Sequence, residues 1–230
     1  MSIESSEIYR SMMLEIKLRL REVDSLIGDK TQELSPLNIE FCFLQFRKVI
    51  EQVCFASIVC DQQRYNDFRF LEGETSTDDA GNYENDWNAR IILSKLKAIS
   101  PHFMPIPLGN KSSSNGQHHF ERSDVTATHN KLITMFKKCG SFLHIPKPFG
   151  EEYASHIKQQ KQKYKAANET VIKYSEYFKL LLWQHAAVGI EYTPNDKLDS
   201  LNKANPKNAW LVDFGDINSN DISVTLAVAQ

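Results

Sequence analysis

The stretch that decides the fold is residues 128–150, THNKLITMFKKCGSFLHIPKPFG. It predicts a short amphipathic helix that begins at Thr128 and ends near His144, before a Pro-Lys-Pro sequence. One face of this helix is apolar, and the edge beside it is basic. Glycine inside a helix costs about 1 kcal/mol relative to alanine, so we expect a second helix to cross closely at Gly140.

The composition is that of an ordinary globular protein. The 230 residues are 41% hydrophobic and 24% charged, with a formal net charge of -2. Because there is no overall basic excess, contact with a nucleic acid would require a local basic patch. The four cysteines lack CxxC spacing and favour a reducing cytoplasm as the location. We expect neither a secretory leader nor a membrane-spanning helix, and therefore no membrane partner.

Four further helices are expected, at residues 5–30, 36–65, 83–99 and 151–188. In the first, Lys17 and other charged residues lie outside the apolar face. The second is apolar around most of its circumference, which is typical of a central helix. The last and longest carries an apolar seam with heptad spacing, which must pack on another helix. The partner is either the first helix or a second subunit. The seam consists of Tyr164, Ala167, Val171, Tyr174, Phe178, Leu181, His185 and Val188.

The end of the chain changes to the period of a β-strand. Residues 208–216 and 221–229 alternate between apolar and polar positions and predict two antiparallel strands. A lone hairpin is unstable in water, so its apolar face should lie on the helices. Residues 101–126 are predicted to be a loop, with a short strand or hairpin near residues 120–125. The expected domains are a helical bundle at 1–188 and a hairpin appendage at 189–230.

Two sets of charged residues stand out in the predicted helices. Arg47 and Glu51 are spaced i,i+4 in the apolar second helix, which predicts a partly buried structural ion pair. Lys158, Lys161 and Lys165 share one face of the last helix. This face is either simply solvated or a stripe that contacts the phosphates of a nucleic acid.

No metal or cofactor site is predicted. His118 and His119 are adjacent, but they lack the helical i,i+4 spacing and the cysteine partners typical of zinc sites. The sequence also lacks a Gly-rich phosphate loop, a Walker sequence and an HExxH motif.

Two segments resemble the HEPN-like helical bundles of prokaryotes. They are FLQFRKVIEQVCFA at residues 43–56, and FKKCGSFLHIPKPFG at residues 136–150, which leads into the long last helix. The chain is similar to uncharacterised bacterial proteins with an Arg-x-x-x-Glu second helix and a Cys-Gly-x-x-Leu-His-x-x-x-Pro-[Phe/Tyr]-Gly segment. The resemblance covers residues 36–186 and implies a HEPN-like bundle. Together with the periodicity of the chain, the expected fold is mainly α, a five-helix HEPN-like bundle with a long C-terminal helix and a small C-terminal antiparallel hairpin.

The resemblance also implies candidate site residues. HEPN ribonucleases use an arginine followed after four to six residues by a histidine, and the pairs face each other across a dimer and cleave RNA without metal. The histidine corresponds to His144. The arginine has no counterpart, because Lys137 and Lys138 occupy its window, and lysine lacks the planar bidentate fork of arginine.

The expected function is therefore a non-enzymatic HEPN-like module. It would act by dimerising or by binding a protein partner, RNA or a nucleotide, in a bacterial defence or toxin-antitoxin setting. One alternative is a metal-independent endoribonuclease in which His144 transfers protons and Lys137 or Lys138 stabilises the phosphate, with Arg47 reaching the same cleft. The other is a structural or scaffold helical protein without an active site.

Overall fold

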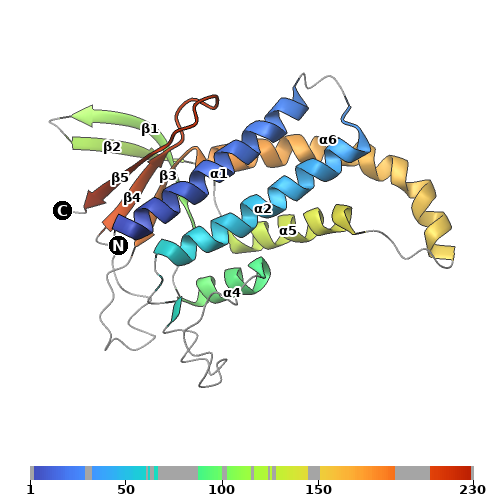
Figure 1. The fold of residues 1–230 in the computed structure, drawn as a ribbon, viewed down its shortest axis with the longest axis horizontal. Coiled ribbons are helices and arrows are strands. Elements are labelled where there is room, and N and C mark those ends of the chain that lie inside the picture. Colours follow the sequence, from blue (N-terminus) through green and yellow to red (C-terminus); the bar gives the residue numbers. More distant parts are fainter. Residues whose placement is uncertain are drawn as a thin grey trace.

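The computed structural model describes residues 3–28, 33–60, 62, 65–66, 88–99, 103–114, 117–123, 125, 128–144, 151–189 and 208–228. Within these residues it contains five helices and one five-stranded antiparallel sheet (Figure 1). The helices are α1 (Ile3–Ile27), α2 (Pro36–Cys60), α4 (Ala89–Ile99), α5 (His129–Leu143) and α6 (Glu151–Leu182). The strands are β1 (Ile106–Ser114), β2 (Gln117–Arg122), β3 (Gln184–Gly189), β4 (Asn208–Asp213) and β5 (Ser223–Val228). The protein is thus mainly helical with a small antiparallel sheet, as the sequence predicted.

Helix α2 lies at the centre of the bundle and contacts α1, α4, α5 and α6. Its aromatic residues connect it to two neighbours. Phe43 stacks on Phe142 of α5 with ring centroids 4.2 Å apart, and Phe46 stacks on Phe178 of α6 at 5.7 Å. The central position predicted from its apolar circumference is confirmed.

The apolar seam of α6 packs inside the chain. Its residues Val171, Phe178 and Leu181 are fully buried in the same core as α1 and α2. Lys179 also donates to both carboxylate oxygens of Asp24 on α1, at 3.0 and 2.8 Å. Of the two partners left open by the sequence, the structure supplies the helices of the same chain.

Helix α6 ends six residues earlier than the predicted end at residue 188, so the prediction that His185 and Val188 extend the helical seam is wrong. Residues Gln184–Gly189 form β3, which pairs with β4 along its whole length. Nδ1 of His185 forms a hydrogen bond of 2.8 Å with the carbonyl oxygen of Leu182, the last residue of α6. One of the free carbonyls at the end of the helix thus has a partner. Pairing with a strand distant in sequence overrides the helical spacing.

The prediction of a loop at residues 101–126 is wrong for most of this segment, because β1 and β2 form a hairpin there. The strand expected near residues 120–125 overlaps only the end of β2. This Ser- and Asn-rich segment has little intrinsic strand preference. It joins the sheet through β3, with Ile106 opposite Ala186 and Pro107 opposite His185.

The strand order is β2-β1-β3-β4-β5. The antiparallel pair predicted at the end of the chain is confirmed as β4 and β5. The two strands are one edge of a larger sheet rather than a separate hairpin, and the expected domain boundary at 188/189 falls inside β3.

Sheet and helices share one hydrophobic core, in which Trp210 and Phe214 lie with Tyr9 and Met13 of α1. Lys17 is fully buried, contrary to its predicted place outside the apolar face of α1. Its ammonium group donates to the carbonyls of Phe214 at 2.6 Å and Asp221 at 2.8 Å. None of the helices in the described part of the chain is long and apolar enough to cross a bilayer.

Candidate functional site

Helix α5 carries the centre of the candidate site and is held by caps at both ends. At its start, the hydroxyl of Thr128 accepts from the backbone N–H of Lys131 at 3.2 Å. At its end, the N–H of His144 donates to the carbonyl of Gly140 at 3.2 Å. Between them Leu132, Met135, Cys139 and Phe142 are buried, while Lys137 and Lys138 are exposed. The end of α5 therefore exposes a basic edge to solvent.

The close helix crossing that the sequence predicted at Gly140 is not found, because only side chains lie near this residue, and at ordinary contact distances. A Cβ atom placed on Gly140 would lie 3.4 Å from Nη1 of Arg47 and 3.9 Å from Nε2 of His144. Both groups thus lie within 4 Å of one point. An arginine of α2 and the histidine that caps α5 thus both approach the one residue of this turn that has no side chain.

The guanidinium group of Arg47 is held in a fixed position. Its Nε donates to Oε1 of Glu51 at 3.2 Å, the pair that the spacing indicated. Its Cζ lies 4.1 Å from the ring centroid of Phe136, a cation–π contact. Within the described residues, neither Nη nitrogen donates a hydrogen bond. The edge of the guanidinium that points to Gly140 and His144 is therefore available for a ligand.

A second cation reaches this turn from α6. Lys163 donates to the carbonyl of Ser141 at 2.8 Å, and its Nζ lies 4.4 Å from the ring centroid of Phe142. The Nζ of Lys138 lies 5.4 Å from the same centroid. Partial burial and then the charge of Lys138 lower the pKa of Lys163, against an opposing effect of Glu40. We call Arg47, Lys138, His144 and Lys163 the α5 cationic site.

Cys139 lies beside this site but is not suited to nucleophilic chemistry. Burial raises the pKa of its thiol to about 12, although Arg47 acts in the opposite direction. The thiolate is the reactive form of cysteine, so the group stays unreactive near neutral pH.

The structure brings together only part of the predicted set. Lys138 and His144 belong to the α5 cationic site, and Lys137 is exposed on the same helix. Lys165 instead points toward Glu33, with 4.0 Å between Nζ and Oε1. The side chains of Lys158 and Lys161 lie outside the described residues. The predicted stripe on the last helix is thus not joined to the site through Lys165.

The role of Lys163 was not predicted. Helical spacing groups residues 158, 161 and 165 on one face of α6 and leaves Lys163 off it. The sequence held no signal for Lys163, because its bond to Ser141 depends on how α5 and α6 pack.

Among the described side chains, no group of three or more His, Cys, Asp or Glu residues could hold a metal ion. Comparisons with protein-family models, with curated proteins and with solved structures found no match to this chain. The HEPN-like resemblance stays a prediction from the sequence, and the geometry of the α5 cationic site is the basis for proposing a function.

Proposed function

We propose that this protein is a non-enzymatic HEPN-like module that binds RNA through phosphate contacts at the α5 cationic site. The observation that carries the proposal is the convergence of Arg47, Lys138 and Lys163 on the last turn of one helix. The chain as a whole has a net charge of -2, so this local cluster matters for attracting RNA.

The charges of the cluster are only partly neutralised by the described residues. Glu51 bonds Nε of Arg47 and leaves both Nη nitrogens without a described partner. A planar guanidinium edge suits two oxygens of one phosphate. Lys138 and Lys163 repel each other, which contributes to the lowered pKa of Lys163. A phosphate bound to the two lysines would relieve this repulsion, and the free donors of Arg47 offer a further phosphate contact.

The dimer implied by the HEPN-like resemblance would need a surface other than the seam of α6. Most of that seam is buried in the core shared with α1 and α2, including Ala167, Val171, Phe178 and Leu181. Binding to RNA does not depend on this question, because the α5 cationic site is built within one chain.

The test is a titration of labelled single-stranded RNA with the full chain, read by fluorescence polarisation at several salt concentrations. We expect Arg47→Met and Lys163→Met each to weaken binding roughly fivefold, and to reduce the salt slope by about one, as the loss of one phosphate contact does. Lys165→Met is the matched control, because this lysine lies on the same helix but points toward Glu33. Equal losses in all three variants, or no saturable binding by the wild type, would contradict the proposal.

A second candidate function is metal-independent cleavage of RNA. The observation that favours it is the approach of Arg47 Nη1 and His144 Nε2 to one point at Gly140, because α2 supplies there the arginine that α5 lacks. His144 would accept the proton of a ribose 2′-hydroxyl as its oxygen attacks the adjacent phosphorus. The bond to the 5′-oxygen of the next nucleotide would break, leaving a cyclic phosphate and, after protonation, a 5′-hydroxyl. Arg47 would stabilise the added negative charge.

Cleavage and binding are separated by one pair of assays. Wild type and His144→Ala are incubated with RNA in EDTA, and their affinities are measured in parallel. Cleavage by the wild type that disappears in His144→Ala, with RNA affinity retained, would establish the enzyme. Binding without cleavage by the wild type is the result that we expect for the non-enzymatic module.

A further inference from the structure

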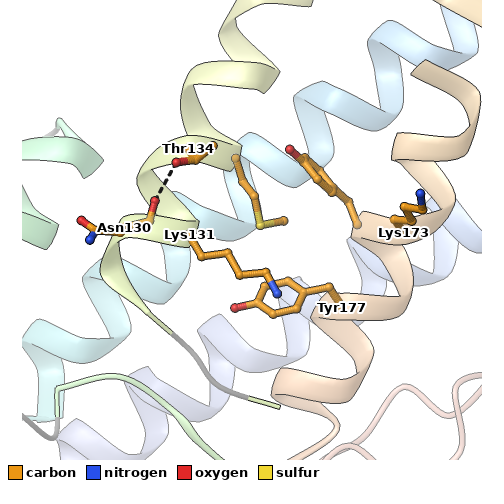
Figure 2. A pocket seen from close by; sticks show the side chains of 7 residues that line it. Asn130, Lys131, Thr134, Lys173 and Tyr177 are labelled. Atoms are coloured by element: carbon orange, nitrogen blue, oxygen red, sulfur yellow. Dashed lines mark hydrogen bonds between the residues drawn. The ribbon is translucent and has the colours of Figure 1, made fainter. Parts of the chain in front are cut away.

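A cavity of about 470 Å³ lies between α5 and α6 (Figure 2). It is formed by the first half of α5 and the second half of α6, including Lys131, Met135, Tyr174 and Tyr177. Its residues on α5 precede His144 by about ten positions, or about 15 Å along a helix. The cavity is therefore a separate feature from the α5 cationic site. Its volume falls in the range of pockets that hold small organic molecules.

The inner wall of the cavity is apolar and uncharged. Met135 and Tyr177 are buried, and Tyr174 is half-buried. Burial raises the pKa of both Tyr174 and Tyr177 to about 12, so their hydroxyls stay neutral at physiological pH. A thioether and two aromatic rings form a surface suited to the apolar body of a ligand.

One positive charge lies beside this apolar wall, on the exposed side chain of Lys131. Figure 2 shows Lys131 reaching from α5 to the ring of Tyr177 on α6, and its Nζ lies 3.5 Å from the ring centroid. Within the described residues no carboxylate pairs with this ammonium group. Partial burial lowers the pKa of Lys131, so the charged form lacks some of its hydration. A ligand anion would supply the missing counter-charge.

The other lysine at the cavity already has a partner. Lys173 donates to Oε1 of Glu169 at 2.7 Å, which neutralises its charge. The hydroxyl of Thr134 donates to the carbonyl of Asn130 at 2.9 Å, so it has no proton left for a ligand. The first turn of α5 contains no acidic residue and adds the partial positive charge of a helix start. The cavity thus offers one full positive charge rather than two.

We propose that this cavity binds a small organic monoanion, a carboxylate with an apolar aromatic body. The carboxylate binds Nζ of Lys131, and the body packs on Met135 and Tyr174. A single unpaired cation matches a singly charged carboxylate better than a doubly charged phosphate ester, whose second charge would have no positive partner at the cavity. This inference does not depend on RNA binding at the other end of α5.

Isothermal titration of the full chain with three probes tests the proposal. The probes are 4-phenylbutyrate, its neutral analogue 4-phenylbutan-1-ol, and phenyl phosphate. We expect saturable binding of one 4-phenylbutyrate per chain, with an affinity about tenfold above that of the alcohol, the order of one charge-assisted hydrogen bond. Phenyl phosphate should bind more weakly than the carboxylate.

Variants then locate the charge. Lys131→Met keeps the length of the side chain and should remove the advantage of the acid over the alcohol, while the affinity for the alcohol stays the same. Lys173→Met and the exposed Lys137→Met are controls that should retain the advantage. The proposal is overturned if the wild type shows no saturable binding, if phosphate binds more tightly than carboxylate, or if Lys131→Met keeps the preference for the acid. The comparison of probes on the wild type decides the matter even if a variant fails to fold.

Discussion

The two ends of the molecule use the same kinds of side chain in opposite ways. Where α1 meets the sheet (Figure 1), Lys17 and His185 are fully buried, and each side chain forms two hydrogen bonds. At the last turn of α5, Lys138 and His144 are exposed, and the ring of His144 forms no hydrogen bond with the described residues. The lysine and histidine at one end thus have the same chemistry as those at the other end, but they differ in burial and in hydrogen-bond partners.

At the end where α1 meets the sheet, both ring nitrogens of His185 form hydrogen bonds. Its Nδ1–H donates to the carbonyl of Leu182, and its Nε2 accepts from the hydroxyl of Tyr9, both at 2.8 Å. Burial keeps the tyrosine protonated by raising its pKa well above 10. Polar groups with every position filled stabilise a fold but have nothing left for a ligand. The cations at the last turn of α5 have few carboxylate partners. They therefore contribute less to the stability of the fold and are available to bind a ligand.

The largest effect should follow from Lys17→Met. The substitution leaves the buried carbonyl of Phe214 without its side-chain donor and removes a second bond to the carbonyl of Asp221, so we expect a loss of about 3 kcal/mol in the free energy of unfolding. Urea denaturation at neutral pH measures it. Lys138→Met is the matched variant at the other end and should change stability by less than about 0.5 kcal/mol. Similar losses in the two variants would remove the distinction between the ends.

The pH dependence of stability should come next in size. Burial lowers the pKa of His185 to about 4, whereas the unfolded chain has the ordinary value of 6.5. Between these values the unfolded state binds more protons, so stability is full above pH 6.5 and falls as the pH drops toward 4. The difference corresponds to about 3 kcal/mol at most.

Urea denaturation across this pH range tests the assignment to His185. His185→Leu should be less stable than the wild type at pH 7 and should lose less stability on acidification. His144→Ala should keep the wild-type dependence, because that ring makes no described hydrogen bond. An unchanged slope in His185→Leu would assign the dependence to carboxylates.

Arg47→Met should have an intermediate effect on stability. The variant loses the bond to Glu51 and the contact with Phe136, both only partly buried, so we expect a loss of about 1–2 kcal/mol in the free energy of unfolding. Thermal and urea denaturation provide the measurement. A loss as large as that of Lys17→Met would place Arg47 with the structural cations and weaken its proposed role in binding RNA.

Gly140→Ala should have the smallest effect and the opposite sign. A Cβ atom here would be in ordinary contact with Arg47 and His144, at 3.4 and 3.9 Å. Replacing a helical glycine would then stabilise the protein by about 0.5 kcal/mol. A destabilised variant in urea denaturation would show that the guanidinium cannot move, which would strengthen its description as a fixed group.

Much of the helical part of the fold could be predicted from the sequence, because it depends on local periodicity. The apolar circumference of α2 indicated a central helix, and the Thr128 and His144 signals bounded α5 to within a residue. The same reasoning failed at His185 and Val188, whose spacing continues the seam of α6 although they lie in β3. It failed again at β1 and β2, whose serines and asparagines have no strong strand pattern.

Taken alone, the sequence determined which segments become helices and which pair of strands ends the chain. These features follow from side-chain periodicity and backbone preference within a few residues. Only the tertiary structure decided that Lys17 is buried, that β3 replaces the end of a helix, and that Arg47 and Lys163 reach the last turn of α5. Those outcomes depend on which distant segments pack together, and helical spacing within one segment carries no information about its neighbours.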